Sequence, residues 1–118
     1  MKKQSERVVR QHDRQRIERI RKSIPDDDHL FRQSQLFGIL SDPNRLKIMS
    51  ALRKAELCVH EITGIIGPSL SAISHQLRLL KALRLVRFHK LGKEVYYTLA
   101  DNHIEKLMDL AAEHINEK

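Results

Sequence analysis

The chain has 118 residues, which suits a single domain with a modest hydrophobic core. Its formal net charge of +7 indicates a polyanionic partner, with nucleic acid favoured over an acidic membrane surface. The single cysteine excludes an intrachain disulfide and an all-thiolate metal site within one chain. No long apolar run follows the basic start, which excludes a signal peptide or membrane span, so we expect a cytoplasmic protein.

The positive charge is concentrated in an N-terminal arm, residues 1–24. This arm holds nine Lys and Arg against three Asp and Glu, so it carries six of the seven surplus charges. It is predicted to be helical in part and to end at Pro25, where Asp26–Asp28 can cap the next helix. We therefore expect a basic arm at residues 1–24 and one domain at residues 25–118. The arm either contacts DNA phosphates or is only a solvated extension.

Three helices are predicted after the arm. The first covers His29–Leu40, where apolar residues recur at helical spacing. A second begins at Ser41-Asp42-Pro43, since proline is favoured at the first helical position. The third is predicted at Glu56–Ile66 and is closed by Gly67-Pro68, which a helix rarely passes.

A fourth helix and a hairpin follow this turn. Ser69 or Ser71 can cap the helix. Its inward face is expected to hold Ile73, Leu77, Leu80 and Leu83. Two strands, Leu85–Lys90 and Lys93–Leu99, are predicted on either side of Leu91-Gly92. The sequence therefore predicts a mainly α fold with a small β-hairpin, the winged helix-turn-helix.

The segment Asp101–Glu117 is predicted to form one amphipathic helix that needs a partner. Its apolar stripe consists of Ile104, Leu107, Met108, Ala111 and Ile115. Asp101 and His103 lie at its start, and His114 and Glu117 at its end. The two histidines are eleven residues apart, which is about 16 Å along a helix, so one helix cannot close both around one ion.

Each of these pairs is half of a possible metal site. If the helix packs antiparallel against a second copy, a two-fold axis brings the first pair of one subunit to the second pair of the other and creates two sites. Two imidazoles and two carboxylates suit zinc, or cobalt by similar ligand preference. The alternative is a dimerisation helix with ordinary polar ends.

Four stretches form an ordered set of motifs: Leu40–Ile48, Glu56–Ile62, Ser71–Leu77 and Leu85-Val86. Followed by the Asp-x-His and His-x-x-Glu spacing, they closely resemble the ArsR–SmtB family of bacterial winged-helix metal-sensing repressors. The match covers most of residues 36–117 and leaves the basic arm outside. The resemblance implies a homodimer with paired C-terminal helices, bound to double-stranded DNA as a repressor. It also implies a zinc site across that interface at Asp101, His103, His114 and Glu117, with cobalt and nickel as alternative metals.

The resemblance implies two further features. In similar members the ring nitrogen of the third ligand that is not bound to metal reaches a backbone carbonyl after the recognition helix, which here joins His114 to Arg84. A second metal site would lie at Cys58, and its candidate ligands are His60, Glu61 and His12, with Asp13 and His29 as substitutes. The arm has no cysteine, so a thiolate-rich site is excluded within one chain. The alternative is that Cys58 is a small buried hydrophobe.

Residues matching the family's DNA contacts lie on the fourth helix: Ser71, Ser74, His75 and Gln76. Glutamine can pair with adenine in bidentate fashion, although Gln76 can also be a solvated helix residue and His75 can pack against the hairpin. Arg78 is expected to contact phosphate. Lys90 and Lys93 at the hairpin tip, with Arg87 behind them, suit phosphate or minor-groove contacts. A two-fold dimer predicts an inverted-repeat operator.

These features predict a zinc-responsive repressor that leaves its operator when metal binds between the C-terminal helices. The alternative is a repressor of the same fold without a metal effector. An enzyme is not expected, because four protein ligands leave no position for a catalytic water and no nucleophile motif or Gly-rich phosphate loop is visible.

Overall fold

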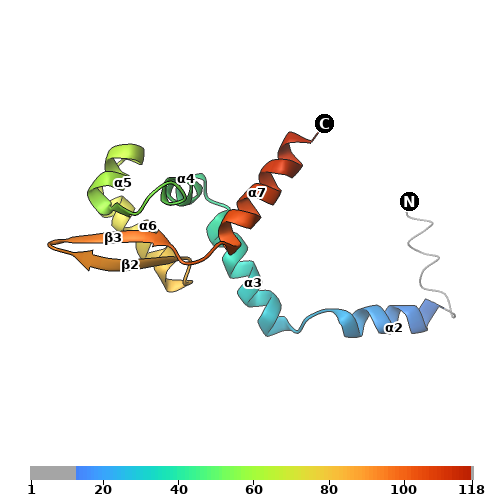
Figure 1. Cartoon of the computed structure of the whole chain (residues 1–118). Helices are drawn as coiled ribbons and strands as arrows, with labels where there is room; N and C mark the ends of the chain where they lie inside the picture. Colours follow the sequence, from blue (N-terminus) through green and yellow to red (C-terminus); the bar gives the residue numbers. More distant parts are fainter. Residues whose placement is uncertain (1–12, 118) are drawn as a thin grey trace. The chain divides into compact units, whose positions relative to one another are not determined.

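The computed structural model describes residues 13–117 (Figure 1). The helices are α2 (Asp13–Ser23), α3 (Asp27–Leu40), α4 (Pro43–Leu52), α5 (Val59–Ile66), α6 (Leu70–Ala82) and α7 (His103–Asn116), and the strands are β1 (Leu57–Cys58), β2 (Val86–Leu91) and β3 (Glu94–Leu99). The chain divides into two units, residues 1–35 and 36–118, so that α3 begins in the first unit and ends in the second. The expected boundary before residue 25 stays a prediction.

The first unit contains α2 and the start of α3. No residue of α2 is buried, and Arg21 Nη1 donates to Glu18 Oε2 at 3.0 Å on its surface. Asp26 begins α3, because its carboxylate accepts the backbone N–H of His29 at 2.9 Å. The expected helix within the arm and the acidic cap after it are therefore confirmed for the part of the arm that the structure describes.

In the second unit, local signals in the sequence set the starts of two helices. Asp42 Oδ2 accepts the N–H of Arg45 at 3.0 Å, and Pro43 is the first residue of α4. Ser69 caps α6, since its Oγ accepts the N–H of Ala72 at 3.2 Å. Between α5 and α6, Gly67 has φ of +71°, a left-handed conformation that glycine adopts without a steric penalty. These helix starts follow the sequence predictions.

The core of this unit lies where α4, α5 and α6 meet the sheet. Its fully buried side chains are Ile48, Met49, Ile62, Leu77 and Leu80. The sheet adds Leu57 and Val86, and α7 adds Ile104. The inward face predicted for α6 is confirmed, with Ile73, Leu77 and Leu80 buried and Leu83 packed against them.

The sheet has three antiparallel strands in the order β1-β3-β2, one strand more than the predicted hairpin. Leu57 pairs with Tyr97 and Cys58 with Tyr96. The prediction of a helix over Glu56–Ile66 was therefore wrong at its start, because α5 begins only at Val59. Local periodicity does not reveal β1, since the partners of this two-residue strand lie almost forty residues later in the chain.

The C-terminal helix is shorter than predicted at both ends. Asp101 lies before α7, where its Oδ1 accepts the N–H of His103 at 2.9 Å. Glu117 follows the helix in an extended conformation, and its N–H donates to the His114 carbonyl at 3.3 Å. Within residues 13–117, no helix is long and apolar enough to span a membrane.

Candidate nucleic-acid interface and metal centre

The exposed face of α6 carries the side chains predicted to read DNA. Ser71, His75 and Arg78 are exposed, and Ser74 is half-buried beside them. Ser71 Oγ lies 3.3 Å from the capping hydroxyl of Ser69, so two hydroxyls gather at the helix N-terminus. The N-terminal part of a recognition helix is the part that approaches base edges in the major groove. The structure thus groups these side chains on one surface.

Gln76 occupies a different position on α6. It is half-buried on the flank that faces α4, and its Oε1 accepts a hydrogen bond from Arg45 Nη1 at 3.2 Å. Gln76 also borders a hollow of about 90 Å³ next to Gly67 and Pro68. Sequence reasoning missed Arg45: the residue lies within a matched motif, but periodicity gives no sign of its partner on α6.

The hairpin of β2 and β3 carries exposed cations. Lys90 and Lys93 are exposed on either side of Gly92, which has φ of +66° at the turn. Arg87 is exposed at the start of β2. At the base, Lys81 Nζ lies 3.7 Å from the centroid of the Phe88 ring, a cation–π contact that joins α6 to β2. The tip is therefore free to present positive charge while its base is anchored.

The four expected C-terminal ligands form two separate pairs. His103 Nδ1 lies 3.1 Å from Asp101 Oδ1, and His114 Nδ1 lies 3.7 Å from Glu117 Oε2. Both imidazoles are well exposed, at 78% for His103 and 87% for His114. The backbone N–H of His103 and the charges of His103 and Arg87 hold the pKa of Asp101 below its usual value, despite partial desolvation.

Each pair supplies one imidazole and one carboxylate. Within residues 13–117, no three or more His, Cys, Asp or Glu side chains of a single chain lie close enough together to hold a metal ion. Two half-sites brought together would give two nitrogen and two oxygen donors, a set that fits zinc. The donor chemistry therefore fits the expected metal, provided that two copies contribute.

Arg84 lies close to the first of these pairs in the fold. It has a positive φ of 60° in the turn between α6 and β2, and it borders a hollow of about 550 Å³ that Asp101 and Arg87 also line. His114 lies at the other end of α7, and within residues 13–117 no hydrogen bond joins it to Arg84. The expected link between these residues requires His114 of a second copy.

The region of Cys58 is occupied by structural contacts. Cys58 is only 5% exposed, and its backbone N–H donates to Glu61 Oε1 at 3.0 Å, which caps α5. His60 is exposed. His12 lies outside the described residues. Asp13 and His29 belong to the first unit. One of the three candidate ligands in the second unit is thus buried, and a second is engaged as a helix cap.

A guanidinium that sequence reasoning also missed joins α7 to the rest of its unit. Arg53, just after α4, donates through Nη1 and Nη2 to the two carboxylate oxygens of Asp109 at 3.0 and 3.2 Å. Glu105 Oε2 lies 4.0 Å from Arg53 Nε. The hydrogen bond to Asp109 is the main cause that raises the pKa of Arg53. Desolvation opposes it, and the charges of Asp109 and Glu105 add smaller increases. Salt-bridge partners so distant in sequence have no local signature.

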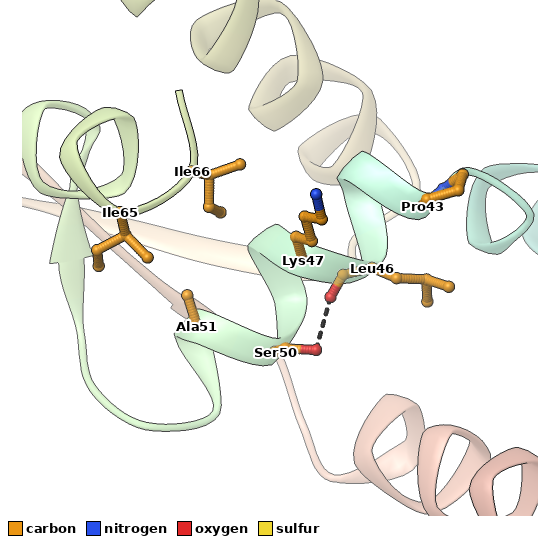
Figure 2. Close-up of a pocket in the computed structure, with 7 residues that line it drawn as sticks. All are labelled: Pro43, Leu46, Lys47, Ser50, Ala51, Ile65 and Ile66. Carbon is orange, nitrogen blue, oxygen red and sulfur yellow. Dashed lines mark hydrogen bonds between the residues drawn. The ribbon is translucent and has the colours of Figure 1, made fainter. Parts of the chain in front are cut away.

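A hollow of about 610 Å³ lies between α4 and α5, and the predicted site residues do not line it. Figure 2 shows Ile65 and Ile66 of α5 on one side of it and residues of α4, including Lys47 and Ala51, on the other. Ser50 Oγ donates to the Leu46 carbonyl of its own helix at 2.8 Å. The hollow is mainly apolar, and its polar groups do not converge on a common point.

Comparison with known proteins identifies the family. Residues 42–87 match the family described as bacterial regulatory protein, arsR family. The transcriptional repressor SmtB homolog of Synechocystis sp. is 39% identical over 103 residues, which cover 87% of this chain and 78% of that protein. The chain belongs to the ArsR family. It is an ArsR/SmtB-type transcriptional regulator with a winged helix-turn-helix fold, and it is not an enzyme.

Other ArsR-family relatives and solved structures agree. The regulator NmtR of Mycobacterium tuberculosis is 38% identical over 97 residues, covering 81% of each chain. A CadC homolog of Staphylococcus aureus, a cadmium resistance regulator, is 42% identical over 85 residues, covering 71% of this chain and 70% of that protein. The solution structure of apo-NmtR matches with a TM-score of 0.64, over 78% of each chain at 38% identity. A homodimeric winged helix-turn-helix domain from Mycobacterium bovis matches with a TM-score of 0.69 at 26% identity, covering 80% of this chain and 94% of that domain.

Proposed function

We propose that this ArsR-family regulator is a zinc-responsive transcriptional repressor that acts in the cytoplasm as a homodimer. The observation that carries the proposal is the pairing of one imidazole with one carboxylate at each end of α7, 3.1 Å apart for His103 and Asp101 and 3.7 Å apart for His114 and Glu117. Neither pair suffices for a four-coordinate site. A two-fold axis that runs two α7 helices antiparallel completes both.

The exposed side of α7 supports this dimer. Ala111 and Ile115 of the apolar stripe are exposed, Ile115 at 78%, so the stripe continues beyond the part of the helix that packs on its own domain. Leu110, beside the stripe, is also 62% exposed. Such a stripe is unfavourable in water, and a second α7 is its natural partner. The relatives support a metal effector: one is named for cadmium resistance, and another is named as an SmtB homolog.

Zinc is favoured over other metals by the donor set. Two imidazoles and two carboxylates suit its tetrahedral preference, whereas the single buried cysteine offers little to a metal that prefers thiolates. When bound, zinc would join the half-sites of two subunits by coordinate bonds. Cobalt and nickel are the alternatives to be compared in titrations.

DNA is bound, in this proposal, by α6 and the hairpin. Ser71, Ser74 and His75 approach base edges, and Arg78 contacts phosphate. At the wing, Arg87, Lys90 and Lys93 add charge on both sides of the main contact. The operator is then an inverted repeat whose half-sites are about one helical turn apart.

The link from metal to DNA is proposed to run through His114. One ring nitrogen serves as ligand, while the other donates to the backbone carbonyl of the partner's Arg84. The position of Arg84 supports this link, because Arg84 lines the same hollow as Asp101, next to the first half-site. Coupling of about 1–3 kcal/mol is typical of allosteric regulators and suffices to release an operator.

The decisive experiment combines zinc titration with DNA binding for three proteins. Wild type should bind two zinc ions per dimer. On saturation with zinc it should lose affinity for a DNA duplex that it has selected from a random pool. His103→Ala should lose both ions and remain on DNA at all zinc concentrations. His89→Ala removes a half-exposed histidine that lies outside the half-sites and should behave as wild type.

The alternative, a repressor of the same fold without a metal effector, gives a different result. In that case wild type would hold the duplex equally well with and without zinc. Retention of two tightly bound zinc ions by His103→Ala would instead place the metal elsewhere, and the Cys58 region would be the next site to test.

A further inference from the structure

Arg45 connects three elements of the second unit. Its backbone N–H donates to Asp42 at 3.0 Å, its Nε donates to the Ile39 carbonyl at 2.8 Å, and its Nη1 donates to Gln76 Oε1 at 3.2 Å. Ile39 lies in the last turn of α3 and Gln76 in the middle of α6. Among residues 13–117, this is the one hydrogen bond that a side chain of α6 makes with a different helix.

The chemistry of the guanidinium fixes the orientation of the Gln76 amide. Arginine has only hydrogen-bond donors, so the atom of Gln76 that faces it must be the carbonyl oxygen and not the amide nitrogen. Gln76 Oε1 is therefore directed towards α4. A bidentate contact with adenine needs this oxygen and the amide nitrogen together at the base edge, which this orientation disfavours.

The position of Gln76 on α6 agrees with this orientation. His75, one residue earlier, is exposed, whereas Gln76 is half-buried on the flank facing α4. Ile39, Leu36 and Leu40 at the end of α3 pack against the core. The guanidinium therefore holds the recognition helix to a segment that is itself fixed in the domain.

We propose that Arg45 is a positioning residue for operator recognition, and that Gln76 acts through Arg45 and not by pairing with a base. This inference rests on the proposed DNA-binding function. Because Arg45 joins α6 to the end of α3, it sets the angle at which Ser71, Ser74 and His75 enter the groove. Its loss would weaken recognition at every base pair of a half-site instead of at one.

Two substitutions of Gln76 separate the roles. Gln76→Glu keeps an oxygen acceptor for Arg45 but removes the amide donor that a base contact requires. Gln76→Met has similar length and no strong acceptor, so it breaks the contact. Each full-length variant would select duplexes from a random double-stranded pool, and its affinity for the selected duplex would be compared with that for a random one.

Gln76→Glu should select the same sequence as wild type, with an affinity lowered equally for selected and random DNA by its added negative charge. For Gln76→Met, the ratio of the affinity for selected DNA to the affinity for random DNA should fall about tenfold, as expected for the loss of one charge-assisted hydrogen bond. If both variants instead changed the preferred base at one position of each half-site, Gln76 would be a base-reading residue and the proposal would be wrong.

A double-mutant cycle gives an independent test. Arg45→Met combined with Gln76→Met should be no less selective than Arg45→Met alone, because both changes break one contact; additive losses would contradict the inference. Arg53→Met is the matched control, since it removes a guanidinium that contacts α7 and not α6.

If Arg45→Met does not fold, the two Gln76 variants still decide whether Gln76 reads a base or acts through Arg45. If wild type selects no sequence from the pool, the proposed DNA-binding function fails together with this inference.

Discussion

Tyr96 lies at the centre of the three-stranded sheet, between Cys58 of β1 and His89 of β2. Its ring stacks with the imidazole of His89, with centroids 6.1 Å apart and planes 22° apart. Desolvation is the main cause that raises the pKa of Tyr96, followed by the negative charge of Glu61 and smaller effects of other acidic groups. The phenol is therefore held in its neutral form by the fold.

We predict that this environment makes the fold sensitive to alkaline pH. A tyrosine whose pKa is raised in the folded state favours folding below its unfolded value of about 10 and loses that contribution as pH rises through the folded value. In a Tyr97→Phe protein, Tyr96 is the sole tyrosine. Absorbance of tyrosinate should then titrate above pH 10 in buffer and at about pH 10 in denaturant. Equal midpoints in the two media would contradict the effect of burial.

At the scale of elements, the two ends of the apolar stripe of α7 differ in burial. Ile104 is 3% exposed and packs into the core of its own domain, whereas Ile115, three turns later, is 78% exposed. Leu107 and Met108 are half-buried between them. The helix therefore anchors itself by its first turn and leaves its last turns available to a second copy.

Substitutions at the two ends of this stripe should have separable effects. Ile104→Ala should lower the free energy of unfolding by about 2–5 kcal/mol, because it leaves a cavity in the core. Ile115→Ala should leave the fold of each subunit intact and weaken the dimer. Denaturant unfolding and sedimentation at several protein concentrations distinguish these outcomes. A dimer unaffected by Ile115→Ala would place the interface elsewhere.

The hairpin tip is the second element whose role can be tested. Alanine at Lys90 and Lys93 should weaken selected and random duplexes to a similar extent, since exposed lysines contact phosphates and not bases. A plot of the logarithm of DNA affinity against the logarithm of salt concentration has a negative slope. If both lysines contact phosphate, the double variant should make this slope shallower by about 2 per subunit. A loss confined to the selected duplex would show that the tip reads sequence.

At the scale of the whole molecule, the basic arm precedes residues 42–87, which match the family model. The Synechocystis SmtB homolog aligns with 103 of the 118 residues, so that alignment begins no later than residue 16 and includes the last part of the arm. Six of the seven surplus positive charges lie before residue 25. In the described part of the arm, α2 has no buried side chain. The packing of α2 therefore gives no reason to expect that the second unit needs the arm in order to fold.

Removal of residues 2–24 should leave the thermal unfolding and the zinc response of the protein largely unchanged and reduce its DNA affinity at low salt. Every phosphate that the arm neutralises contributes about 0.9 to the salt slope, so the truncated protein should have a shallower slope. Comparison of wild type and truncated protein across a salt series measures this difference. Identical curves would mean that the arm does not bind DNA.

The starts of α4 and α6 and the inward face of α6 were predictable from the sequence because their causes are local. Asp42 and Ser69 cap their helices through residues three positions later, and the inward face of α6 follows from a 3.6-residue period. The two pairs of C-terminal ligands were also predictable as pairs, since His103 lies two residues after Asp101 and Glu117 three after His114.

Contacts between residues distant in the chain were decided only by the tertiary structure. Leu57 and Cys58 form a strand because β3 passes beside them, and Arg53 finds Asp109 fifty-six residues later. Arg45 reaches Gln76 across thirty-one residues and turns the amide of a predicted base-reading residue towards α4. The sequence determined which side chains have the chemistry to bind DNA and metal, because residue type and short spacing are local properties. The fold decided where those side chains point, because each orientation depends on which distant donor or acceptor packs against it.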